Sequence, residues 1–237
     1  MNASGAISGV YIDVETGDFD AARSALLEVG AVEFVMEASG PRVVKTWEQV
    51  IVPGPRLMIC KEALAVQGRT FADLTDEALE KAGAVSEEVA FNRLMMWLPY
   101  DLSKPENKRL WSHNAGFENP FLYHWEKRVF PKRDTKSFVF PVRGVVTCSK
   151  ELARNLRAIG RLPVLSTSLK DLAPHFGIVG PQAHRGLLDA HLGVQVLWHL
   201  MRVAGWLPQS EQAEPIPYRT GSYGEDIRFA REGREPL

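Results

Sequence analysis

The sequence predicts an α/β protein built on a mixed β-sheet. Segments rich in apolar and β-branched residues cluster in the first 52 positions, with short connections that favour antiparallel pairing. Further short strand-like segments then alternate with segments of helical periodicity, which is the pattern of an α/β domain. The chain has 237 residues, 45% of them hydrophobic, so it is long enough to bury one large core.

Three strands are expected at the start of the chain, over residues 8–13, 26–36 and 43–52. The first ends in a polar stretch, and the second is an almost continuous apolar run. A Ser-Gly-Pro-Arg turn signal at 39–42 separates the second strand from the third. The short connections predict an antiparallel meander.

The pattern changes to helical periodicity further along the chain. Residues 75–98 carry acids early and apolar residues at helical spacing late, which predicts one or two helices broken near Gly83. The remaining expected elements are a short strand at 109–113, a helix at 116–129 with Pro120 in its first turn, a short strand at 144–148, helices at 150–159 and 168–177, and a long helix at 183–206.

The composition predicts one domain followed by a tail. From residue 208 onward the chain is rich in Pro, Gly and charged residues and has no amphipathic period. We therefore expect a folded domain over 1–207 and an extended or partly disordered tail over 208–237.

Charge and cysteine content narrow the class of protein. The formal net charge of -1 excludes a uniformly basic nucleic-acid coat, although local basic patches stay possible. The two cysteines lack the spacing of a zinc site, which favours a reducing compartment. Neither a signal peptide nor an apolar run of about 18 residues is visible, so we expect a soluble cytoplasmic protein without a membrane span.

The first strand ends with two carboxylates, Asp13 and Glu15. Residues two apart in a strand project from the same face, so these two anions would repel unless a cation lay between them. Mg²⁺ and Mn²⁺ prefer such oxygen ligands. The pair alone indicates either a metal site or a strand that runs into a polar turn.

Two later segments offer further polar side chains near the starts of helices. Asn114 and Glu118 follow the strand at 109–113, and His184 and Asp189 open the last helix. A neutral histidine is a plausible general base near pH 7. Each segment also has a simpler interpretation, because acids in a first helical turn are favoured by capping and by the helix dipole.

The order of these motifs resembles the DEDDh branch of the DnaQ-like 3′–5′ exonucleases, which have a ribonuclease H-like fold. Asp13 and Glu15 match the Asp-x-Glu motif, the segment HNAGFE ending at Glu118 matches the second motif, and His184 and Asp189 match His-x-x-x-x-Asp. Within this branch the chain is most similar to the ribonuclease T family, over roughly residues 8–206. The resemblance implies a mixed sheet with three antiparallel strands followed by parallel ones, flanked by helices, and makes 1–207 an exonuclease domain.

The resemblance also implies a two-metal site with Mg²⁺ or Mn²⁺. Asp13, Glu15 and Asp189 would hold the first ion, with Asp13 bridging to the second, and Glu118 would assist the second. His184 would accept a proton from the attacking water, and the product would be a nucleoside 5′-monophosphate. One position departs from the family, because Glu118 stands where the family has Asp. The longer side chain leaves two outcomes open, an active enzyme or a catalytically degenerate nucleic-acid-binding homologue.

A surface for a single-stranded DNA or RNA 3′ end is implied in the same way. Aromatic side chains stack on bases and contribute about 1–3 kcal/mol per base. The residues matched to this surface are Phe19 and Phe117 as stacking platforms, Leu64 and Val66 as apolar wedges, and Thr16 and Asn114 at the terminal nucleotide. The alternative for the aromatic pair is core packing. A homodimer is implied by the family, and a proofreading exonuclease bound to a polymerase is the competing function.

Overall fold

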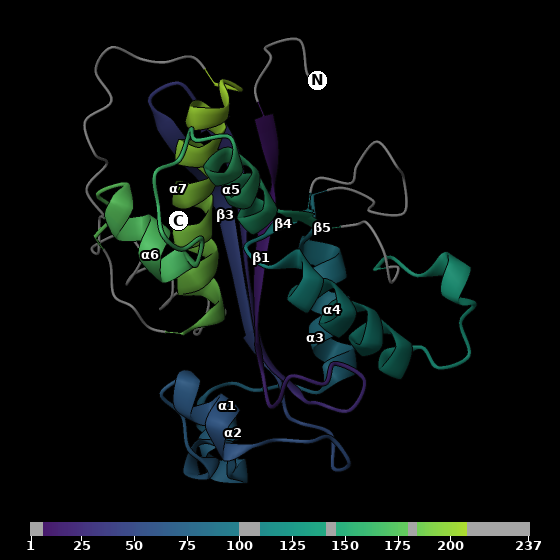
Figure 1. Cartoon of the computed structure of the whole chain (residues 1–237). Helices are drawn as coiled ribbons and strands as arrows, with labels where there is room; N and C mark the ends of the chain where they lie inside the picture. Colours follow the sequence, from purple (N-terminus) through teal and green to yellow (C-terminus); the bar gives the residue numbers. More distant parts are fainter. Residues whose placement is uncertain (1–6, 100–109, 141–145, 180–183, 208–237) are drawn as a thin grey trace, which may run out of the picture.

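Five strands form one mixed sheet in the order β3-β2-β1-β4-β5 (Figure 1). A computed structural model of the chain describes residues 7–99, 110–140, 146–179 and 184–207. The strands are β1 (Ile7–Thr16), β2 (Leu26–Glu37), β3 (Gly40–Val50), β4 (Leu110–Ser112) and β5 (Val146–Cys148). β2 pairs antiparallel with β1 and β3, whereas β4 is parallel to β1 and β5. The predicted mixed sheet is therefore confirmed.

Helices cover both faces of this sheet. The helices are α1 (Lys61–Val66), α2 (Asp76–Lys81), α3 (Glu87–Trp97), α4 (Ala115–Val129), α5 (Ser149–Ala158), α6 (Leu169–His175) and α7 (Gly186–Ala204), with short 3-10 turns η1 (Phe71–Leu74) and η3 (Thr135–Ser137). Helices α5 to α7 lie on one side of the sheet and α3 and α4 on the other, while α1 and α2 lie beyond the end of β1 (Figure 1). No helix of the described residues is both long and apolar enough to cross a membrane.

Strand alternation in β1 divides its side chains between two cores. Val10, Ile12 and Val14 pack in a cluster that includes side chains of α3 and α4. Tyr11 instead belongs to the cluster that contains the buried face of α7. Because side chains alternate along a strand, the positions that follow Tyr11 on the α7 face are Asp13 and Glu15.

Several element boundaries differ from the prediction. Strand β3 begins at Gly40 because Pro41 is already paired with Met36, and a proline is tolerated there since β3 is an edge strand. Helix α4 begins at Ala115, so Pro120 is its sixth residue and lies inside the helix, not in the first turn. Helix α1 was not expected, because six residues are too few for a clear period.

The predicted break within 75–98 is confirmed. Helices α2 and α3 are separate, and Gly83 between them has a φ of 66°, a left-handed conformation that favours glycine. The predicted tail over 208–237 lies outside the described residues, as do positions 109, 144, 145 and 183 at the starts of three other expected elements. The last helix begins at Gly186, three residues later than expected.

Candidate active site

The end of β1 contributes the first two carboxylates. Glu15 pairs with Glu28 of β2 and Asp13 pairs with Gly30, so these four residues lie on the face that α7 covers. Glu15 is 7% exposed and Asp13 is partly buried. The carboxylates therefore stand between the sheet and the start of α7.

Helix α7 begins directly above β2 because glycines meet there. A Cβ atom added at Gly30 would lie 2.1 Å from the backbone of Gly186, the first residue of α7. Asp189 lies in the first turn of α7, so this close approach places it above the two carboxylates. His184 lies just before the helix. His184 Nδ1 lies 3.7 Å from Asp189 Oδ2. Among the described residues, Glu15, His184 and Asp189 each offer one ligand atom, all within 4.8 Å of one another.

The fourth carboxylate comes from the start of α4. Strand β4 is parallel to β1 and ends at Ser112, so the two strands end at the same edge of the sheet. Asn114 is the N-cap of α4, and Glu118 lies in its first turns. Glu118 is 4% exposed, and its Oε2 accepts a hydrogen bond from Ser112 Oγ at 3.3 Å.

Burial and mutual repulsion favour the protonated form of these acids when no cation is bound. Burial raises the pKa of Glu15 and of Glu118 to about 8. Burial, with the nearby charge of Glu28, raises the pKa of Asp189 to about 7. The pKa of Asp13 is raised well above its ordinary value, first by burial and then by Glu15 and Asp189. A divalent cation would stabilise the ionised carboxylates and so lower these pKa values. The donor set therefore fits a hard metal ion, which prefers oxygen ligands.

A cavity of about 260 Å³ joins these groups. Its lining includes all but one of the predicted site residues: Asp13, Glu15, Thr16, Phe19, Val66, Asn114, Phe117, Glu118, His184 and Asp189. Ala63, Val14 and Gln67 also line it and were missed. Gln67 Nε2 donates to the Thr16 carbonyl at 2.7 Å. No sequence signal marks Gln67, because only the fold brings α1 against the end of β1.

The structure does not bring Leu64 to the cavity, which corrects the expectation for this residue. Leu64 is fully buried in a cluster with Ala25 and Leu27. Leu64 and Val66 lie two apart on helix α1, so they cannot point the same way. Val66 is 55% exposed and lines the cavity, so only one of the two expected wedges is available to a ligand.

Aromatic side chains lie at the mouth of the cavity. Phe19 is 71% exposed, although burying a phenylalanine is normally favourable. Its ring meets Phe117 edge to face with centroids 6.4 Å apart, and Phe117 packs on Phe121 at 4.8 Å. Phe117 thus both joins the core and lines the cavity, whereas Phe19 lines the cavity and is largely exposed to solvent.

Comparison with known proteins identifies the class that this fold and site define. Residues 10–197 match the family model RNase_T, described as an exonuclease family, so the chain belongs to this family of exonucleases. Ribonuclease T of Citrobacter koseri is 31% identical over 212 residues, covering 86% of this chain and 91% of that protein. Ribonuclease T of Photobacterium profundum is 28% identical over 214 residues, covering 87% of this chain and 89% of that protein.

Solved structures share the fold at low identity. Exonuclease I of E. coli, in complex with a dT13 oligonucleotide, matches with a TM-score of 0.64 and 13% identity over 84% of this chain. Exonuclease I of Methylocaldum szegediense matches with a TM-score of 0.62 and 17% identity over 82% of this chain. This chain spans about two-fifths of those proteins. The predicted ribonuclease H-like fold and the predicted 3′–5′ exonuclease class are confirmed.

Proposed function

We propose that this protein removes nucleoside 5′-monophosphates from the 3′ ends of single-stranded DNA or RNA with the help of two divalent ions, Mg²⁺ or Mn²⁺. One observation carries the proposal: four carboxylates, a histidine and two aromatic side chains from three separate parts of the chain line one cavity. Carboxylates suit metal-assisted phosphodiester hydrolysis, and the aromatic rings suit a strand with unpaired bases.

Four side chains would hold the ions, namely Asp13, Glu15, Glu118 and Asp189. When bound, divalent ions stabilise the charge that develops on the phosphate and make water more acidic. The protein's own part is to hold the four carboxylates together against their repulsion, and the packing of α4 and α7 against the sheet that contains β1 does this. Glu118 reaches the cavity despite its extra methylene, which supports an active enzyme over a degenerate homologue.

His184 would move a proton in the proposed reaction. Its Nδ1 faces Asp189 Oδ2 at 3.7 Å, which leaves Nε2 as the atom that would accept a proton from the attacking water. The carboxylate would also stabilise the imidazolium that results. The side chain is 55% exposed, so a water molecule can reach it.

The mouth of the cavity would hold the 3′ end of the strand. Phe19, Phe117 and Val66 line this cavity and would offer apolar surface to the bases. Thr16 and Asn114 also line it and would contact the terminal nucleotide. The exonuclease domain would span 1–207. By family resemblance alone we also propose a homodimer and a cytoplasmic location.

A degradation assay tests the proposal. The purified chain is incubated with single-stranded oligonucleotides and with duplexes that carry a 3′ extension. Both DNA and RNA are tested, in Mg²⁺ and in Mn²⁺. We expect 5′-monophosphates and progressive shortening of single strands, both absent from an Asp13→Asn variant. Binding without shortening would instead identify a degenerate homologue, and shortening that survives Asp13→Asn would reject the assigned site.

A further inference from the structure

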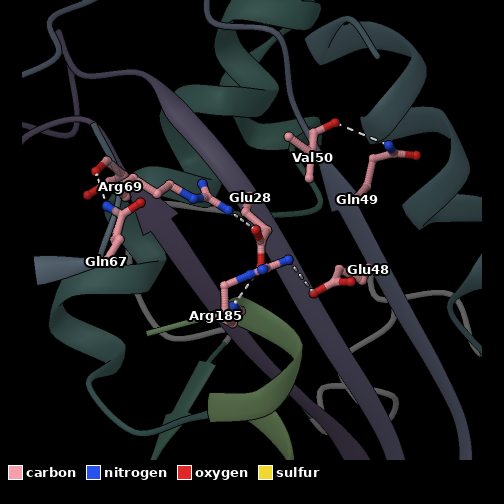
Figure 2. Close-up of polar contacts among 9 residues, drawn as sticks. Glu28, Glu48, Gln49, Val50, Gln67, Arg69 and Arg185 are labelled. Atoms are coloured by element: carbon pink, nitrogen blue, oxygen red, sulfur yellow. Dashed lines mark hydrogen bonds and ion pairs between the residues drawn. The ribbon is translucent and has the colours of Figure 1, made fainter. Parts of the chain in front are cut away.

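A buried carboxylate behind the cavity, that of Glu28, accepts hydrogen bonds from three donors (Figure 2). Its Oε1 accepts from Gly186 N at 2.9 Å and from Arg185 Nε at 3.3 Å. Its Oε2 accepts from Arg69 Nη2. Glu28 is fully buried, and a buried charge is tolerated only when it is paired in this way. None of these four residues lines the cavity.

The three donors come from two segments, here called the two walls, whose neighbouring residues line the cavity. Arg69 follows α1, which contributes Val66, and Gln67 ties that segment to Thr16. Arg185 and Gly186 open α7, which carries Asp189. Figure 2 shows the two arginines reaching Glu28 from opposite sides, with Arg185 also facing Glu48 at 3.9 Å. Glu28 is therefore a point at which the two walls are joined.

Glu28 also lies beside one of the carboxylates proposed to hold metal. It is the cross-strand partner of Glu15, so the two side chains lie on the same face of the sheet. Arg69, which pairs with Glu28, is only 14% exposed.

We propose that Glu28 is a positioning residue with two separable arms. Through Arg185 and Gly186 it holds the start of α7, and with it Asp189 and His184. Through Arg69 it holds the wall that carries Val66 and Gln67. The inference rests on the proposed function, because it assigns hydrolysis to the first wall and strand binding to the second.

Cutting one arm at a time tests the proposal. Partners that orient metal ligands typically contribute about 10–100-fold in metal affinity or activity. Arg185→Met should lower kcat and weaken Mn²⁺ binding by about tenfold or more, with KM for the oligonucleotide nearly unchanged. Arg69→Met should raise KM and leave kcat nearly unchanged. Arg185→Lys, which keeps the charge, should recover part of the loss.

A matched control separates positioning from general stability. Arg42 forms an exposed ion pair with Glu37 near the far end of β2, so Arg42→Met should change neither kcat nor KM. Thermal unfolding of every variant measures the loss of stability. If both arginine variants change kcat and KM together, in proportion to their loss of Tm, Glu28 has only a structural role and the proposal is overturned. It is equally overturned if neither variant differs from wild type.

Two readouts do not depend on turnover. Mn²⁺ binding is measured by electron paramagnetic resonance, and oligonucleotide binding by fluorescence anisotropy in Ca²⁺. If the wild-type chain binds Mn²⁺ and the oligonucleotide but cleaves nothing, the proposed function fails. The separate roles of the two arms are still judged from the affinities of the variants for Mn²⁺ and for the oligonucleotide. If Arg185→Met weakens oligonucleotide binding and Arg69→Met weakens Mn²⁺ binding, the assignment of the arms is wrong.

Discussion

Gly30 and Gly186 touch backbone to backbone. A Cβ atom at Gly30 would lie 2.1 Å from Gly186 C, and one at Gly186 would lie 2.8 Å from Gly30 N. Real Cβ atoms do not come this close to other atoms, so helix α7 can rest on β2 only because both residues are glycine. Since Asp13 is the strand partner of Gly30, this contact sets how near α7 comes to the carboxylates of β1.

Gly30→Ala should therefore push the start of α7 away from the sheet. Overpacking usually costs about 1–3 kcal/mol, and a collision with backbone belongs at the upper end of that range. We expect a lower Tm and a large loss of exonuclease activity. Gly116→Ala is the stability control, because nothing lies within 4 Å of its added Cβ and alanine favours a helix. A Gly30→Ala variant with wild-type Tm would contradict the contact.

For activity, the negative charge of the Glu118 side chain should matter more than the length of that side chain. Glu118→Gln keeps the size but removes the charge, and a lost ion-holding carboxylate should cost several kcal/mol, or about 100-fold or more in kcat/KM. Glu118→Asp restores the residue type of the family and should stay within about tenfold of wild type. Ser112→Ala removes only the hydrogen bond to Oε2 and should have a smaller effect. A fully active Glu118→Gln variant would remove Glu118 from the site.

His184→Gln should lower turnover with little effect on substrate binding. General acid–base catalysis contributes about 10²–10⁴-fold, and in the proposed function the imidazole contacts the attacking water and not the bases. Steady-state kinetics would show a lower kcat at nearly constant KM. His124, a partly buried histidine on α4 outside the cavity lining, gives the control His124→Gln. An increase in KM alone would contradict the assigned role.

The stability of the metal-free protein should fall as pH rises. Folding raises the pKa of Glu15 and Glu118 to about 8 and that of Asp189 to about 7, whereas unfolded carboxyls titrate near about 4. The stabilisation from these protonated groups is thus fully present below about pH 4 and is lost as pH rises through about 8. We expect Tm in a chelator to be lower at about pH 9 than at about pH 6.

Added Mn²⁺ should remove most of this pH dependence, because the ion holds the carboxylates ionised. Thermal unfolding with and without Mn²⁺ measures both effects. The Glu118→Gln variant serves as the control and should show a shallower fall in the chelator. A metal-free Tm that stays level or rises over this range would show that the carboxyls ionise normally.

Phe19→Ala should weaken strand binding without affecting stability. The ring is 71% exposed, and stacking on one base contributes about 1–3 kcal/mol, which corresponds to about 5- to 150-fold in affinity. Anisotropy with a labelled single strand in Ca²⁺ measures the change. Met96 on α3 is 83% exposed and does not line the cavity, so Met96→Ala should bind normally. Equal affinity of the Phe19→Ala variant and wild type would exclude a stacking role.

Local sequence accounts for much of the fold. The first three strands and the break at Gly83 follow from apolar runs, turn residues and helical periodicity, all of which are short-range signals. Boundaries were less predictable where tertiary context decided them. Pro41 joins an edge strand that needs no donor at that position, and Pro120 lies inside α4, although proline usually marks the end or start of such elements.

Three ordered motifs in the sequence were enough to predict the family and to propose its catalytic side chains, because such motifs carry both residue type and order along the chain. The choice between Leu64 and Val66 as the residue that reaches the cavity depended on the folded chain, since the two side chains point in different directions from one helix turn. The fold also brings Glu28 into contact with both Arg69 and Arg185. Glu28 and Arg185 are 157 positions apart in the sequence. Such contacts depend on the packing of distant elements, and no local pattern of residues encodes them.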